Sequence, residues 1–509
     1  MKKYPIGIQD FEVLRKNNYL YIDKTMYLEK LFNISKYYFL SRPRRFGKSL
    51  FINTLEALIE GKKELFDGLY IADKWDWSKS NPVIKIGFNG ISHKEKGLYN
   101  AINDRLDEIA VAYKVEIDEK SISAKFQKLI IQLYEKYGPV AILIDEYDKP
   151  IIDYLGTDTA KAIENRDIMK SFYSILKDAD PYLKIVLLTG ISKFARVSIF
   201  SDLNNLYDLS IDDSFAGVCG ITQEELEQNF VEELQKYDKQ AIKEWYNGYT
   251  WDMKTSVYNP YSLLTFFENG RFGNYWFSSG TPTFLINLTK NRQLYNFENI
   301  KISAVQIECY DIEKLQIIPL MYQTGYLTFK NRDDESGVYT LGYPNKEVKR
   351  SYLDMLATAY IDNDMIGGTV VSVEIRDVLK NKELEKLQDL VNSLFASIPY
   401  DLWKNQSESF YHAILHIIFS LVGVYVQSEV HTSAGRIDCL VQTERYVYCF
   451  EFKLGGTPLD FSAVEALQQI KDKGYLKPYL QQGKECIAIG VNFSKEQKQV
   501  AEILWESVG

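Results

Sequence analysis

Short apolar runs alternate with longer amphipathic stretches through the first third of the chain. Four runs have the length and composition of buried strands, at residues 37–40, 83–88, 140–144 and 184–188. Stretches with apolar residues at helical spacing, such as 50–59 and 124–137, separate them. Strands that alternate with helices predict an α/β domain with a mainly parallel sheet, whose ligands bind at the carboxyl ends of the strands. We place this domain at residues 1–212.

The pattern is less regular between residues 213 and 369. A helix is expected at 222–237, because Thr222 is a suitable N-cap and Glu225 follows three residues later, which completes a capping box. A strand is expected at 325–329. We interpret residues 213–369 as a mostly helical connector.

A second α/β pattern occupies residues 370–509. A helical run at 408–423 precedes three expected strands at 424–430, 436–441 and 447–453. A helix at 461–476 and a last strand at 486–493 follow. The order of elements predicts a separate domain with its own sheet.

Composition limits the function. The chain has 509 residues, a length that fits about three domains, and a net charge of −9. An acidic chain is a poor candidate for coating nucleic acid non-specifically, although a local basic groove remains compatible with it. The five cysteines form no CxxC pair, no apolar run reaches about 18 residues, and the first residues lack an apolar signal core. We expect a cytoplasmic protein with reduced cysteines and no membrane partner.

The first expected strand is followed by the segment 42–49, Arg-Pro-Arg-Arg-Phe-Gly-Lys-Ser. Gly47, Lys48 and Ser49 match the end of a phosphate-binding loop. In such a loop, backbone N–H groups and the lysine bind nucleotide phosphates, and the serine hydroxyl binds Mg²⁺. The position between a strand and a helix is the one that this motif requires.

The first half of the loop departs from the motif. The pattern GxxxxGK[ST] requires glycine where this chain has Arg42, and Pro43 has no N–H to donate. Arg44 and Arg45 would replace some of the missing N–H contacts with positive charge. A site that binds the nucleotide without hydrolysing it therefore stays open as an alternative.

A pair of carboxylates further along the chain forms the second motif of a nucleotide-binding site. Asp145 and Glu146 follow the apolar run 140–144 directly. In ATPases such an aspartate holds Mg²⁺ and such a glutamate activates the attacking water. The tip of another strand, residues 188–193 (Leu-Thr-Gly-Ile-Ser-Lys), would place a polar group beside the γ-phosphate. Either motif alone also fits an ordinary surface turn, but the two together, on correctly ordered strands, predict ATP as a ligand.

A second constellation lies near residue 450. Alternation along a strand puts Glu451 and Lys453 on one face, and a hairpin centred on 444–445 puts Asp438 opposite Glu451. A register two residues different would leave Asp438 and Glu451 diagonal to each other but still on one face. Two carboxylates hold Mg²⁺ or Mn²⁺, which polarises a phosphodiester and lowers the pKa of a bound water. Lys453 would orient that water or stabilise the developing charge. The alternative is a surface hairpin with an ion pair. Glu429, on the preceding strand, would supply a further carboxylate.

Several motifs together resemble the bacterial AAA-ATPase-like family, whose members commonly carry a C-terminal PD-(D/E)XK nuclease-like domain. They are Tyr4–Phe11 (Tyr-Pro-Ile-Gly-Ile-Gln-Asp-Phe), 21–25 (Tyr-Ile-Asp-Lys-Thr), the segment 42–49, 145–148 (Asp-Glu-Tyr-Asp) and 200–206 (Phe-Ser-Asp-Leu-Asn-Asn-Leu). The match covers roughly the first 210 residues and resumes near the C-terminus. The Arg-Pro-Arg-Arg-Phe-Gly-Lys-Ser form is the pattern of the family itself.

The resemblance implies a P-loop NTPase-type sheet first and a restriction-endonuclease-like α/β domain last. It assigns the metal to Asp438 and Glu451 and assistance in catalysis to Lys453, and Gln469 and Tyr475 resemble accessory residues of such sites. The name of the superfamily implies a proline directly before Asp438, but this chain has no proline at that position.

The predicted function is an ATPase coupled to a metal-dependent nuclease that acts on DNA or RNA. Nucleic acid is the expected partner, and a homo-oligomer is compatible with the sequence. A nucleotide-dependent switch that binds nucleic acid or protein without cleavage, or a defence or mobile-element factor, is the alternative.

Overall fold

The computed structural model describes residues 3–193, 200, 203, 205–277, 283–292, 294, 296–308, 316–361, 368–396, 398, 408–421, 425–432, 435–455 and 463–508, some of them, such as 425–432, by their backbone alone. The chain divides into two compact units. Unit 1 comprises residues 1–280 and 298–348, and unit 2 comprises 281–297 and 349–509. The expected connector, 213–369, is thus shared between the two units. The boundaries at 212 and 369 stay predictions.

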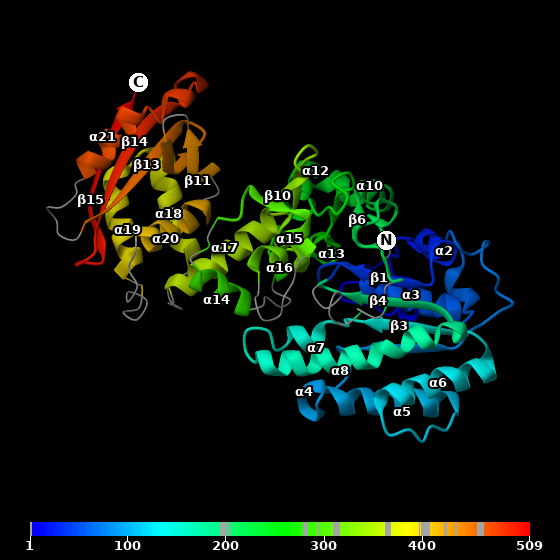
Figure 1. Ribbon diagram of the computed structural model, residues 1–509. Helices are drawn as coiled ribbons and strands as arrows, with labels where there is room; N and C mark the ends of the chain where they lie inside the picture. Colours follow the sequence, from blue (N-terminus) through cyan, green and yellow to red (C-terminus); the bar gives the residue numbers. More distant parts are fainter. Residues whose placement is uncertain are drawn as a thin grey trace. The chain divides into compact units, whose positions relative to one another are not determined.

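Unit 1 is built on a five-stranded parallel sheet, as the apolar runs predict (Figure 1). Its strand order is β2 (Val83–Gly87), β3 (Val140–Asp145), β4 (Leu183–Gly190), β1 (Tyr37–Ser41) and β5 (Tyr207–Asp208). Leu188 of β4 pairs with Phe39 of β1 on one side and with Ile144 of β3 on the other. The carboxyl ends of β1, β4 and β3 therefore lie next to one another.

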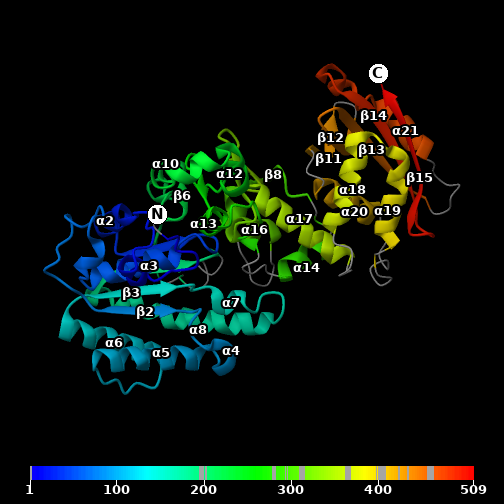
Figure 2. The ribbon, with the colours of Figure 1, turned by 180° about the vertical axis from the view of Figure 1, so that it is seen from behind.

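Long amphipathic helices cover this sheet. α5 (Leu98–Tyr113) and α6 (Ile122–Tyr137) lie beyond β2 and β3 (Figure 2), and α6 also packs on α8 (Thr159–Asp178), where the rings of Phe126 and Phe172 stack at 4.5 Å. α3 (Lys48–Ile59) packs against β3. The shorter helices of this part are α1 (Phe11–Lys16), α2 (Thr25–Ile34), α4 (His93–Lys96) and α7 (Lys149–Ile152).

The helix expected at 222–237 is two helices, α10 (Gln223–Asn229) and α11 (Val231–Lys236). The capping box is present: Thr222 Oγ1 accepts from the Glu225 N–H, and the Glu225 carboxylate accepts from the Thr222 N–H. Phe230 breaks the helix, with φ −128° and ψ 38°, because its buried ring packs between the rings of Tyr4 and Phe267. Tertiary packing overrides the helical spacing here.

The rest of the middle segment of unit 1 is helical with two small sheets. Gly325, with φ +91°, ends α16 (Ile317–Thr324), so the strand expected at 325–329 begins only at residue 328. One sheet pairs β6 (Ile221–Thr222) with β7 (Val257–Tyr258), and the other has the strand order β8 (Ile300–Ser303), β10 (Val338–Gly342), β9 (Thr328–Asp333). The further helices are α12 (Lys239–Tyr246), α13 (Pro260–Asn269) and α15 (Ala304–Glu308). The helix α17 (Lys346–Ile361) begins in unit 1 and continues into unit 2.

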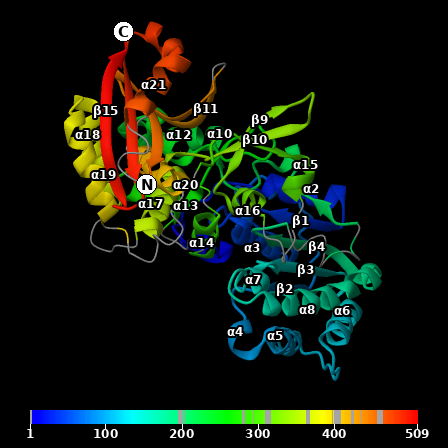
Figure 3. The ribbon, with the colours of Figure 1, turned by 60° about the vertical axis from the view of Figure 1, so that its left-hand side comes forward.

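Unit 2 contains a mixed five-stranded sheet in sequence order, β11 (Tyr425–Thr432), β12 (Gly435–Gln442), β13 (Tyr446–Gly455), β14 (Glu485–Ser494) and β15 (Gln499–Val508). The pair β13–β14 is parallel, and the other pairs are antiparallel. α19 (Leu387–Ala396) and α20 (Glu408–Leu421) cover one face, and α21 (Ala463–Lys473) covers the other (Figure 3). α14 (Thr283–Asn291) and α18 (Gly368–Asn381) complete the unit.

β15 is a strand that the sequence pattern missed, since residues 486–493 were expected to form the last one. It is an edge strand, and amide side chains of α19 bind its backbone. Gln388 accepts from the Ile503 N–H and donates to the Ala501 carbonyl. Asn392 accepts from the Val500 N–H and donates to the Val500 carbonyl. These contacts from one helical turn of α19 replace a neighbouring strand and protect the edge from pairing with another chain.

Two further expectations can be compared with the structure. Cys219, Cys439, Cys449 and Cys486 are buried free thiols, as expected for reduced cysteines. Within the described ranges, no helix combines the length and apolar composition that crossing a bilayer requires.

Candidate functional site

The phosphate-loop segment connects β1 to α3 at the carboxyl edge of the sheet in unit 1. Gly47 is the N-cap of α3 and has φ 99°, a left-handed conformation that glycine adopts without strain. Lys48 and Ser49 form the first turn of the helix. The Lys48 ammonium is buried and donates to the carbonyls of Arg42 and Pro43, at 2.8 and 2.9 Å. The loop thus holds its lysine folded back on itself.

Burial lowers the pKa of Lys48, and the nearby carboxylates Asp145, Glu146 and Asp148 act in the opposite direction. A buried ammonium that depends on these carboxylates is stabilised further when an anionic phosphate replaces the carbonyl contacts.

The side chain of Arg42 takes no part in this site, although Arg42 occupies the position of the missing glycine. Its guanidinium is buried 4.0 Å from the ring centre of Trp251 and donates to the carbonyls of Ser41 and Ser210. Arg42 is therefore a structural residue of the loop. Arg45, with φ 68°, is exposed and its guanidinium lies over the ring of Tyr261.

The carboxylate pair lies beside the loop, at the end of β3. Asp145 Oδ1 accepts from Thr189 Oγ1, at 2.6 Å, on the intervening strand β4. Glu146 follows with φ 52°, a strained conformation for a residue with a side chain. Burial raises the pKa of Glu146. The buried Asp148 accepts from the N–H groups of Ile191 and Ser192 and so holds the segment after β4.

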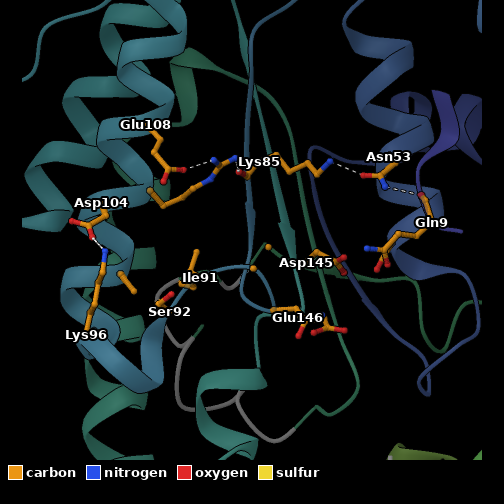
Figure 4. A pocket seen from close by; sticks show the side chains of 16 residues that line it. Gln9, Asn53, Lys85, Ile91, Ser92, Lys96, Asp104, Glu108, Asp145 and Glu146 are labelled. Carbon is orange, nitrogen blue, oxygen red and sulfur yellow. Dashed lines mark hydrogen bonds and ion pairs between the residues drawn. The ribbon is translucent and has the colours of Figure 1, made fainter. Parts of the chain in front are cut away.

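Three neighbouring cavities line this edge of unit 1. One of about 370 Å³ contains Arg44, Arg45, Gly47, Lys48, Ser49 and Glu146 in its wall. A small apolar one of about 100 Å³ adjoins Gly47 and is lined by side chains such as Tyr21, Phe46, Phe51 and Ile221. The third, of about 460 Å³, lies beyond Ser49, Asp145 and Glu146 (Figure 4). All six expected nucleotide ligands and Glu146 thus line one continuous edge.

The second constellation lies in unit 2, on the face of the sheet covered by α21. The pairing of Cys439 with Phe450, continued by one residue, brings Asp438 opposite Glu451, and Asp438 Oδ2 accepts from the Phe452 N–H at 2.9 Å. The rings of Phe450 and Phe419 pack on the opposite face, 4.8 Å apart.

The polar groups of this site are interconnected. Lys453 Nζ lies 3.2 Å from Glu451 Oε1 and donates to Gln469 Oε1 at 2.7 Å. The Gln469 amide donates to the same Glu451 oxygen. Tyr475 is buried nearby, and burial raises the pKa of its hydroxyl. The side chain of Glu429 is outside the described residues.

The donor chemistry fits a hard divalent cation. Glu451 and Asp438 offer carboxylate oxygens, and Mg²⁺ is commonly bound by one or two carboxylates together with water. In the described part of the chain, no group of three or more His, Cys, Asp or Glu side chains is arranged to hold a metal. Among the described residues, the hairpin of β12 and β13 brings two carboxylates, Asp438 and Glu451, to this site.

Comparison with known proteins gives the same two assignments. Residues 5–200 match a family model described as a predicted AAA-ATPase, and residues 406–503 match a model of the PD-(D/E)XK nuclease superfamily. An uncharacterized protein in the vnfD 5' region of Azotobacter chroococcum mcd 1 is 38% identical over 522 residues, which cover 100% of this chain and 99% of that protein. The chain belongs to the AAA-ATPase-like family with a PD-(D/E)XK nuclease-superfamily domain.

Two features of this AAA-ATPase-like protein escaped the sequence patterns. Trp276 Nε1 donates to the Arg44 carbonyl at 3.0 Å, and its backbone N–H donates to the buried Glu347 carboxylate at 2.7 Å. Gly490, next to Glu451 across the β13–β14 pair, lets α21 approach the sheet closely. Neither contact has a local sequence signal, because each joins segments that are distant in the chain.

Gly490→Ala should displace α21 and destabilise unit 2 by about 1–3 kcal/mol, because overpacking a tight contact costs that amount. A Cβ there would lie 2.2 Å from the Ala463 carbonyl oxygen and 2.8 Å from the Leu467 nitrogen. The midpoint of urea unfolding measures the loss. Val464→Ala, at an exposed position of the same helix, is the control and should change the midpoint little. Equal midpoints for the two variants would contradict the close approach.

Burial raises the pKa of Glu347 to about 7 from the model-compound value of 4.5. The folded state then binds more protons than the unfolded state between these pH values, so this group stabilises the fold at low pH. We expect its contribution to fall by up to about 3 kcal/mol as the pH rises from 4.5 through 7. Glu347→Gln should lack this fall, whereas Glu335→Gln, at an exposed position, should keep it. Unfolding free energies measured from pH 5 to pH 8 test this; parallel curves for wild type and Glu347→Gln would reject it.

Proposed function

We propose that unit 1 binds and hydrolyses ATP and that unit 2 is a Mg²⁺- or Mn²⁺-dependent phosphodiesterase for DNA or RNA. The observation that carries the first half is the position of β4 between β1 and β3. That order brings Lys48 and Ser49, from the loop after β1, next to Asp145 and Glu146 at the end of β3.

Each residue of unit 1 has a role that its position supports. The Gly47–Ser49 backbone and the Lys48 ammonium would bind the phosphates, and Ser49 with Asp145 would hold Mg²⁺, which neutralises phosphate charge. Glu146, whose pKa is raised by burial, is suited to accept a proton from the attacking water. The cavity of about 100 Å³ beside Gly47 is lined mainly by apolar side chains, and this lining would offer an apolar surface to part of the base.

The nuclease half rests on the position of the Lys453 ammonium between Glu451 and Gln469. Asp438 and Glu451 would hold the cation, which polarises the phosphodiester and activates a water. Lys453 would orient that water or stabilise the extra negative charge of the transition state. Gln469, bonded to both Glu451 and Lys453, would fix the distance between them.

The contacts of the loop support a link between nucleotide state and the rest of the chain. Trp276 binds the Arg44 carbonyl, and a side chain at Gly325 would meet Pro43 at 2.7 Å. Both residues belong to the middle segment of unit 1. Glu347, which accepts from Trp276, lies in α17, the helix that continues into unit 2. We propose that ATP binding gates the nuclease through this segment.

A second function is favoured by one observation, the hydrogen bonds from Lys48 to the carbonyls of its own loop. A loop that satisfies its lysine internally suits a switch, which binds nucleotide and changes conformation without turnover. Nucleotide-dependent change in oligomeric state together with absent phosphate release would favour this function.

Lys48→Ala should weaken ATP binding at least tenfold, because a charge-assisted contact of this kind contributes about 1.5–3 kcal/mol. Glu146→Gln should bind ATP normally and release phosphate at least a hundredfold more slowly, the contribution expected of a general base. Equilibrium binding of a fluorescent ATP analogue and a phosphate-release assay measure the two effects. The exposed Lys79 provides the control Lys79→Ala. Unchanged affinity in Lys48→Ala would reject the site.

Glu451→Ala and Lys453→Ala should each reduce cleavage of plasmid DNA or single-stranded RNA by at least a hundredfold in Mg²⁺ or Mn²⁺, because each removes a part of the electrostatic stabilisation. EDTA should abolish cleavage by the wild type. Glu444→Ala, at the exposed hairpin turn between β12 and β13, is the matched control. Cleavage by Glu451→Ala at the wild-type rate would reject the nuclease assignment.

A further inference from the structure

The segment Pro5–Gln9, part of the motif Tyr4–Phe11, follows the whole length of the candidate nucleotide site. Pro5 lines both the apolar cavity and the cavity around Lys48. Gln9 lines the cavity around Lys48 and the one beyond Ser49 and Glu146. Residues 5–9 therefore face the loop from the region of the base to the region beyond the last phosphate. We call this segment the strap.

The first two residues of the phosphate loop have no N–H group left for a ligand. The Arg42 N–H donates to the Gly190 carbonyl at 3.2 Å, and the Ser41 N–H donates to Ser210 Oγ at 2.8 Å. Pro43 has no N–H. A nucleotide in this site consequently lacks N–H donors from Arg42 and Pro43, the first two residues of the loop.

The strap carries donors of the missing kind. It forms a turn in which the Ile8 N–H donates to the Pro5 carbonyl at 3.1 Å, and Gly7 at its tip has φ +75°. Among the hydrogen bonds between described residues, none uses the N–H of Ile6 or of Gly7. Both residues line the cavity around Lys48. Successive uncommitted N–H groups in a turn form a binding site for anions such as phosphate.

Asn53 fixes the strap to the phosphate-binding helix. It lies one turn after Ser49 on α3, donates to the Gln9 carbonyl at 2.7 Å and accepts from the Lys85 ammonium at 2.6 Å (Figure 4). The other end of the strap is held by the bond from Tyr4 to Glu233 and by the Leu20 N–H, which donates to the Lys3 carbonyl at 2.9 Å. The turn is thus suspended between two fixed ends.

We infer that the strap is the second wall of the nucleotide site, that the N–H groups of Ile6 and Gly7 bind the triphosphate in place of the donors missing from the loop, and that Asn53 is the residue that positions it. This inference rests on the proposed ATP site. It also gives a role to the Tyr4–Phe11 motif, which neither constellation explains.

Asn53→Asp tests the inference, because a carboxylate still accepts from Lys85 but has no N–H to donate to the Gln9 carbonyl. We expect the KM for ATP to rise about tenfold, the effect of losing one such contact, with kcat within twofold of wild type. Hydrogen exchange at Ile6 and Gly7 should slow on adding Mg²⁺ and AMP-PNP to the wild type and should not slow in Asn53→Asp. Asn53→Ala should behave as Asn53→Asp does.

Lys85→Met is the matched control, because it removes the other partner of Asn53 and leaves the bond to Gln9. Its KM should stay within twofold of wild type; a rise equal to that of Asn53→Asp would overturn the role of the strap. Wild-type protein in which AMP-PNP protects Gly47–Ser49 but not Ile6 and Gly7 would overturn the inference alone. Wild-type protein in which AMP-PNP protects neither segment would overturn the proposed ATP site as well.

Discussion

The parallel register of β1, β4 and β3 is the constraint on which the proposed nucleotide site depends. Because the strands run in one direction and end together, three segments that are distant in the sequence meet at one edge of the sheet. The hydrogen bond from Thr189 to Asp145 shows how the register fixes these segments, because a side chain of β4 orients the carboxylate at the end of the neighbouring strand β3. Reversing one of these strands would move its group to the opposite edge of the sheet, and a different strand order would separate the groups along the same edge.

The loop itself is shaped by packing more than by glycine. In the usual motif a glycine permits a tight turn and exposes N–H groups. In this chain Arg42 is buried against Trp251 and bonded to backbone carbonyls, while Trp276 and Gly325 hold the next two residues. Residues from the middle segment thus contact the loop at three successive positions, 42–44, and help to determine its conformation.

The site in unit 2 depends on a comparable constraint, the close approach of a helix to a sheet. Antiparallel pairing of β12 with β13 brings Asp438 to Glu451, but Gln469 reaches Glu451 and Lys453 only because Gly490 leaves room for α21. Glu502 of β15 accepts from the N–H of Ala463, the first residue of α21, and so holds the start of the same helix. The polar cluster is therefore a property of the sheet and helix together.

The sequence by itself determined the two α/β patterns, the strands that carry each motif, the position of Asp438 and Glu451 on one face of a hairpin, and the capping box at Thr222, because these depend on local periodicity and turn chemistry. It did not determine the break at Phe230, the edge strand β15 or the burial of Arg42, because each depends on side chains distant in the chain. The strap shows the same division: residues 4–11 form a recognisable motif, but only the tertiary structure places them across the cavity from Lys48, through a single amide on α3. Local patterns specify elements and their chemistry; the contacts that bring elements together at a site arise from packing over long sequence distances.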